Sequence, residues 1–122
     1  IPVFEGSIYR FTPDNEIQKQ YWTYEYPVQA LFPMMALVSL TDDLGLENIQ
    51  IPMLMIYSEE DGVVDVQKIK SAYKRFGSSV KELVVVKDAQ GKQSHVLAGD
   101  ALSPGTTEFV KQHIQKFVEK LM

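Results

Sequence analysis

Residues 51–64 read IPMLMIYSEEDGVV, and this stretch decides the fold class. Its apolar part, Met53–Tyr57, is continuous rather than alternating, which is typical of a strand covered on both faces in a parallel sheet. An acidic loop, Ser58–Val64, follows the strand. Asp65 then suits the N-cap of a helix over about Val66–Phe76. The stretch therefore predicts a buried strand that is followed by a loop and a helix.

The same pattern repeats towards the C-terminus. Lys81–Lys87 contains the apolar run Leu83–Val86, which predicts a second covered strand. A long loop, Asp88–Ala101, separates this strand from a last helix, which Ser103-Pro104 opens and which runs to Leu121. Strand, helix, strand and helix make a βαβ unit with a closing helix. We therefore predict an α/β fold with two parallel strands and flanking helices.

The N-terminal part is less regular. Residues 1–25 are rich in aromatic side chains and are predicted to be irregular and cap-like, with room for one extra short strand over Val3–Phe11. We expect one domain over residues 1–122, in which residues 26–122 form the α/β portion.

A strongly apolar helix is predicted next. Pro27 suits a first helical turn, and the apolar residues over Ala30–Leu40 cover most of the helix circumference. Such a helix is expected to be buried. Pro33 should kink it or move its start downstream.

Composition limits the classes of function. The 122 residues carry a net charge of −4 and include no cysteine. We therefore expect no nucleic-acid partner, no disulfide framework and no thiolate metal site. No apolar run reaches the roughly 18–20 residues of a membrane span. Neither a glycine-rich phosphate loop nor metal-ligand spacing occurs, so we expect no cofactor and no metal.

Two titratable residues follow the two predicted strands. Asp61 lies in the loop after the first strand, and His95 lies in the loop after the second. The loops after two adjacent parallel strands leave the same edge of the sheet, so these two side chains can meet there. This edge is also where α/β proteins bind their ligands. A carboxylate beside an imidazole fixes the tautomer of the ring and stabilises its charged form, which is half of a hydrolase triad. The acid also precedes the histidine, as the order Ser, Asp, His requires.

Other titratable residues have simpler interpretations. Asp65 competes with Asp61 as the acid, but its place before an apolar-periodic helix favours capping. His113 lies inside the last helix and is expected to be structural or at the surface. Asp88 and Asp100 flank the histidine loop and are expected to be turn residues.

The chain resembles the C-terminal part of α/β-hydrolases, the superfamily of esterases, lipases and relatives. Residues 51–64 are similar to the segment that delivers the catalytic acid, and residues 94–97, SHVL, resemble the histidine loop after the last strand. Residues 103–121 resemble the closing helix, and the likeness extends over about residues 49–121. Glycine is frequent in the family where Ser58 and Ser94 stand.

The resemblance implies that Asp61 and His95 supply the acid and the histidine of a Ser-His-Asp triad that hydrolyses small ester-like substrates. No Gly-x-Ser-x-Gly occurs, and Gly77-Ser78-Ser79 leads into a strand rather than out of one. Because the chain begins at Ile1 and not at methionine, we expect the nucleophile to lie upstream. This chain alone should then be inactive. The sequence leaves its compartment open.

Two alternatives remain open. Dehalogenases, epoxide hydrolases and acyltransferases share this half of the fold, and a flavodoxin-like interaction module would make Asp61 and His95 unrelated loop residues.

We also expect the chain to self-associate, through the edge of Met53–Tyr57 or the helix at Ala30–Leu40. Pairing of Val3–Phe11 with that edge would instead permit a monomer.

Overall fold

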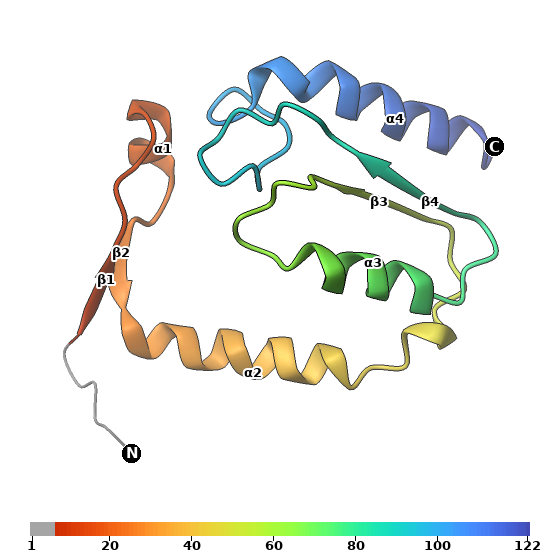
Figure 1. Ribbon diagram of the computed structural model, residues 1–122, viewed down its shortest axis with the longest axis horizontal. Helices are drawn as coiled ribbons and strands as arrows, with labels where there is room; N and C mark the ends of the chain where they lie inside the picture. The colour runs from red at the N-terminus through yellow and green to blue at the C-terminus, as the bar shows by residue number, and fades with distance from the viewer. Residues whose placement is uncertain (1–6) are drawn as a thin grey trace. The chain divides into compact units, whose positions relative to one another are not determined.

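The computed structural model describes residues 7–122 and divides the chain into two compact units, which meet in sequence at Gly45 and Leu46 (Figure 1). The expectation that residues 1–122 form a single domain stays a prediction.

The first unit begins with two short antiparallel strands, β1 (Ile8–Arg10) and β2 (Glu25–Pro27). Tyr9 lies opposite Tyr26 with ring centroids 5.2 Å apart. Arg10 pairs with Glu25 across 2.6 Å. Cross-strand aromatic and charged pairs of this kind stabilise short strands. The expected extra strand is thus found at Ile8–Arg10, and the part of Val3–Phe11 before residue 7 lies outside the described residues.

A helix joins the two strands, so the described part of the segment up to residue 25 is more regular than predicted. This helix, α1 (Glu16–Tyr21), begins after Asn15, whose side-chain oxygen accepts from the Gln18 amide at 2.9 Å. An asparagine N-cap of this type satisfies an amide that the first turn leaves without a partner.

The apolar helix α2 (Leu31–Asp42) follows a 3-10 turn, η1 (Val28–Ala30). Pro27 ends β2 and does not open the helix. Pro33 lies in the first turn of α2, where a proline is tolerated. The prediction that this helix is buried is wrong for the described residues, since none of its side chains is buried and Leu37 is 64% exposed. Its own unit offers only short elements, which cannot cover a helix that is apolar on all sides.

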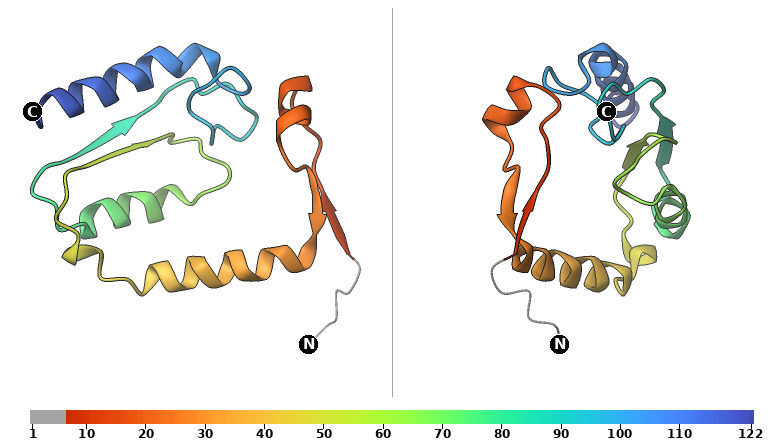
Figure 2. Two further views of the ribbon diagram at one scale, coloured as in Figure 1. Left: turned by 180° about the vertical axis from the view of Figure 1, so that it is seen from behind. Right: turned by 60° about the vertical axis from the view of Figure 1, so that its left-hand side comes forward.

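The second unit contains the predicted βαβ arrangement with a closing helix. Its elements are, in chain order, η2 (Leu46–Asn48), β3 (Met53–Tyr57), α3 (Val66–Arg75), β4 (Lys81–Val85), η3 (Pro104–Thr106) and α4 (Thr107–Glu119). β3 and β4 are parallel, in a register that runs from Met53 opposite Lys81 to Tyr57 opposite Val85. α3 and α4 lie on opposite sides of this strand pair (Figures 1 and 2). The mixed α/β class and the parallel pair are confirmed.

The strands are less covered than their apolar sequences predict. Most residues of β3 and β4 are half-buried, and the buried apolar side chains of this unit are Leu46, Tyr57, Val86 and Phe117. Within residues 7–122, β3 pairs only with β4 and has one free edge. In the described part of Val3–Phe11, residues 7–11, the strand β1 pairs with β2 and not with that edge.

The end of α3 lies very close to the start of the unit. The amide of Gly77 donates to the carbonyl oxygen of Leu46 at 3.3 Å. A Cβ atom at Gly77 would lie 1.9 Å from the carbonyl oxygen of Glu47, so only glycine fits without a backbone shift. The helix predicted over about Val66–Phe76 is observed over Val66–Arg75, so its predicted end is confirmed to within one residue.

Candidate functional site

Asp61 lies in a loop at the carboxyl end of β3 whose turns are closed by side-chain and backbone bonds. The amide of Asp61 donates to the carbonyl oxygen of Ser58 at 3.4 Å. One carboxylate oxygen of Asp61, Oδ1, accepts from the amides of Val63 and Val64 at 2.8 and 2.9 Å. This pattern is a turn closed by an aspartate side chain, and it directs the second oxygen, Oδ2, away from the loop backbone.

His95 lies in the long loop after β4, just beyond a tight turn. The amide of Ser94 donates to the carbonyl oxygen of Gly91 at 2.9 Å, and Ser94 itself has a φ of +47°. This left-handed backbone is rare for a residue with a Cβ atom. The turn places His95 on the side of the loop that faces the acid.

The far end of this loop is fixed to the start of α4. The hydroxyl of Thr106 donates to the carbonyl oxygen of Leu97 at 2.8 Å, and the amide of Gly99 donates to the hydroxyl of Thr107 at the same distance. The fully buried Ser103 accepts from the Gln90 amide at 3.1 Å. His95 is thus carried by a loop that is held at both ends.

The structure brings Asp61 and His95 together. The Nδ1 atom of His95 lies 2.8 Å from Oδ2 of Asp61, although 34 positions separate the residues. The amide of Gly62 also donates to the carbonyl oxygen of Gln93 at 2.8 Å, so the two loops are joined by their backbones beside the pair. The predicted proximity is confirmed. The catalytic roles of both residues stay predictions.

The two side chains differ in exposure. The Asp61 side chain is only 5% exposed, whereas that of His95 is 42% exposed. Burial raises the pKa of Asp61, but the amides of Val64 and Val63 and the contact with His95 outweigh it and leave the pKa below its ordinary value. Asp61 is therefore a carboxylate at neutral pH.

This charge determines what the imidazole can do. A carboxylate only accepts hydrogen bonds, so the proton of a neutral His95 belongs on Nδ1, and Nε2 keeps its lone pair. Within residues 7–122, Nε2 has no hydrogen-bond partner. The arrangement therefore presents a proton acceptor, oriented by a buried carboxylate, at the carboxyl edge of the parallel strands.

The other candidate acids and histidine lie apart from this pair. Asp65 caps α3 by accepting from the amides of Gln67 and Lys68 at 2.7 and 3.4 Å. His113 contacts the carbonyl oxygen of Phe109, four residues earlier in α4, at 2.8 Å. These are structural contacts, as expected from the sequence.

Asp88 and Asp100 are both exposed loop residues. Asp88 has a φ of +60°, which fits the turn expected there, because aspartate tolerates this backbone better than most residues. Asp100 follows Gly99, whose φ is +101°. Neither carboxylate contacts the pair of Asp61 and His95.

Sequence reasoning missed the residues that hold the two loops together. Nothing in the sequence pattern marks Gln93, whose backbone oxygen receives the Gly62 amide. The positive φ of Ser94 could have been predicted, because glycine, which adopts this backbone readily, is frequent at that position in the family that the sequence resembles. The sequence pattern places Glu59 only within an acidic loop, yet its carboxylate makes two hydrogen bonds.

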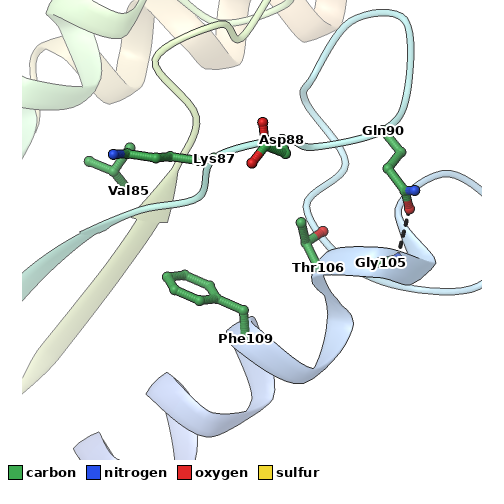
Figure 3. A pocket seen from close by; sticks show the side chains of 7 residues that line it. All are labelled: Val85, Lys87, Asp88, Gln90, Gly105, Thr106 and Phe109. Atoms are coloured by element: carbon green, nitrogen blue, oxygen red, sulfur yellow. Dashed lines mark hydrogen bonds between the residues drawn. The ribbon is translucent and has the colours of Figure 1, made fainter.

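A separate cavity of about 610 Å³ opens where β4 ends and α4 begins (Figure 3). It is lined by Val85, Lys87, Asp88, Gln90, Gly105, Thr106 and Phe109. The Gln90 side chain accepts from the Gly105 amide at 2.7 Å across its rim. Neither Asp61 nor His95 lines it, so this cavity is distinct from the paired side chains.

Among residues 7–122, no three histidine, aspartate or glutamate side chains cluster so that they could hold a metal ion. No helix in this range combines the length and apolar character needed to cross a bilayer. Comparison of the chain with protein-family models, with curated proteins and with solved structures finds no match in any of the three.

Proposed function

We propose that this chain is the C-terminal portion of a serine hydrolase of the α/β-hydrolase type, in which Asp61 orients His95 for the hydrolysis of ester-like bonds. The observation that carries the proposal is the 2.8 Å contact between His95 Nδ1 and Asp61 Oδ2, with Nε2 left without a partner in the described residues. The similarity of residues 51–64 and 94–97 to the acid and histidine segments of that superfamily supports it.

In the proposed reaction, His95 acts as the general base. Nε2 accepts the proton of a serine hydroxyl while the serine oxygen attacks the carbonyl carbon of the ester. The imidazolium that forms is stabilised by the Asp61 carboxylate, and it then returns the proton to the leaving alcohol. Water repeats the sequence to release the acid.

The position of the pair also supports this role. Both loops leave the carboxyl ends of neighbouring parallel strands, where α/β proteins bind their ligands. The Asp61 side chain is buried, whereas the imidazole of His95 reaches solvent. A general base has to be accessible in this way, because it accepts a proton from another group. The nucleophile would come from outside this chain, which contains no Gly-x-Ser-x-Gly.

The coding sequence upstream of Ile1 gives the first test. We expect it to encode a Gly-x-Ser-x-Gly between an apolar run and a helix. In the protein that carries it, hydrolysis of p-nitrophenyl butyrate should fall by roughly 10³–10⁴-fold in Asp61→Asn and at least as much in His95→Ala. The matched controls are Asp65→Asn and His113→Ala, whose contacts lie within α3 and α4 and which should keep nearly full turnover.

Two results would count against the proposal. Equal losses in Asp61→Asn and Asp65→Asn would mean that the acid is wrongly assigned. An upstream sequence without a nucleophile, together with an inactive wild-type protein, would favour a non-catalytic interaction module.

A further inference from the structure

The acid loop carries a second carboxylate that is bonded on both of its oxygens. Oε1 of Glu59 accepts from the hydroxyl of Tyr57 at 2.5 Å, and Oε2 accepts from the ammonium group of Lys70 at 2.8 Å. The Lys70 nitrogen also lies 5.8 Å from the centre of the Tyr57 ring. The end of β3, the loop and α3 are therefore linked through one side chain.

Burial shows where this cluster is anchored. Tyr57 is only 4% exposed, and Glu59 accepts the hydrogen bond of its hydroxyl, which a buried phenol requires. The side chains of Lys70 and Glu59 are 33% and 48% exposed. An ion pair at this exposure adds little to global stability, so its main effect is on the local conformation of the loop.

The charges of the cluster match its contacts. Hydrogen bonds from Lys70 and Tyr57 lower the pKa of Glu59, and the bond to Glu59 raises the pKa of Lys70. Glu59 is thus ionised at neutral pH and keeps both bonds.

Glu59 precedes Asp61 by two residues, and on the other side of Asp61 the amide of Gly62 is bonded to Gln93. Asp61 is therefore flanked by two attachments, one to α3 and one to the histidine loop. Glu60, which lies between Glu59 and Asp61, has an exposed carboxylate without a partner among residues 7–122. The two neighbouring glutamates differ in their contacts and not in their charge.

We infer that Glu59 is a positioning residue, which holds the acid loop on Tyr57 and Lys70 and so keeps Asp61 in contact with His95. This role rests on the proposed function, because it assigns to Glu59 the alignment of the proposed acid and base. Without the attachment, the loop samples conformations in which Asp61 leaves the imidazole, although the fold of the unit persists.

The test compares Glu59→Gln with Glu60→Gln in this chain, by NMR. Both variants remove one carboxylate from the same loop. We expect exchange of the Gly62, Val63 and Val64 amides to accelerate about twofold to fivefold in Glu59→Gln, the range of a half-exposed ion pair. The Val86 amide, bonded to the Tyr57 carbonyl at 2.7 Å, should keep its rate, and Glu60→Gln should match the wild type.

A second readout follows the imidazole itself. The ¹⁵N spectrum of His95 should show a smaller share of the Nδ1-protonated tautomer in Glu59→Gln, and no change in Glu60→Gln. If Glu59→Gln does not fold, Lys70→Met and Tyr57→Phe each remove one attachment and should give the same local acceleration.

The outcomes separate the two proposals. Equal behaviour of the two glutamate variants, or equal acceleration at Gly62 and Val86, would overturn the role of Glu59 and leave the hydrolase proposal standing. Asp61→Asn tests the pair directly, because an asparagine amide donates to Nδ1 and should move the proton to Nε2. If that variant left the tautomer of His95 unchanged, the pair itself would be wrong.

Discussion

Gly62 donates its amide hydrogen to the carbonyl oxygen of Gln93 across 2.8 Å, immediately beside the contact between Asp61 and His95. Backbone atoms thus join the two loops independently of the paired side chains. Substitution of either side chain should therefore alter the chemistry of the pair while the loops stay adjacent.

The stability of the second unit should depend on pH through Asp61. Its pKa is lowered in the folded state, so its carboxylate stabilises the fold above the ordinary value of 3.8, and this contribution is lost as the pH falls through the lower folded value. The free energy of unfolding can be measured with denaturant at a series of pH values from 7 downwards. It should fall more steeply with decreasing pH in the wild type than in Asp61→Asn.

Glu59 acts in the same direction, since its pKa is also lowered in the folded state. The free energy of unfolding of Asp61→Asn should therefore still fall with decreasing pH, but less steeply than that of the wild type. Glu60→Gln, whose carboxylate has no partner among residues 7–122, is the matched control. Parallel curves for wild type and Asp61→Asn would show that the Asp61 carboxylate has no differential contact in the folded state.

Ser94→Gly should stabilise the protein. The φ of +47° at Ser94 crowds its Cβ atom, and glycine removes that strain while it costs some entropy in the unfolded chain. The expected net gain is about 0.5–1 kcal/mol in the free energy of unfolding. Ser94→Ala keeps the Cβ atom and should give no gain, so equal effects in denaturant unfolding would exclude strain as the cause.

Gly77→Ala should destabilise the second unit. The new methyl group would lie 1.9 Å from the Glu47 carbonyl oxygen, which is backbone and cannot turn away. Overpacking of this kind costs on the order of 1–3 kcal/mol. Gly91→Ala is the control, because its Cβ atom would meet Leu102 at an ordinary 3.6 Å. Similar unfolding midpoints for the two variants would contradict the close approach.

The chain by itself should self-associate. Within residues 7–122, β3 has a free edge and α2 exposes apolar side chains such as Phe32 and Leu37. Sedimentation equilibrium at micromolar concentrations should therefore give a mass above that of the monomer. A clean monomer would contradict the prediction.

A single substitution separates the two surfaces. Leu37→Glu places a charge on α2 without touching β3, and Gln115→Glu, at an exposed position of α4, adds the same charge elsewhere. A monomer in Leu37→Glu alone would assign the contact to α2. Continued association in both variants would favour the edge of β3.

Much of the second unit was predictable because its signals are local. The apolar run at Met53–Tyr57 predicted its strand, and the place of Asp65 before an apolar-periodic helix predicted the N-cap. The meeting of Asp61 and His95 followed from topology, since parallel strands end at the same edge.

What could not be predicted depends on contacts between distant residues or on what covers a surface. The Gly62 bond to Gln93 and the packing of Gly77 on Glu47 have no pattern in the sequence, because backbone atoms make them. The apolar residues of α2 predicted a buried helix, and this was wrong for the described residues, because apolar character does not specify which element covers the helix.

The register of β3 and β4 has a consequence for the order of folding. Each residue of β3 lies opposite one 28 positions later, so no turn can bring the strands together as it does in a hairpin. The connecting segment, which contains α3, has to reverse the direction of the chain before the first inter-strand bond forms, and the entropy of closing that loop is lost beforehand. We expect substitutions in the α3 cap at Asp65 to slow refolding, whereas those near His95 should mainly accelerate unfolding.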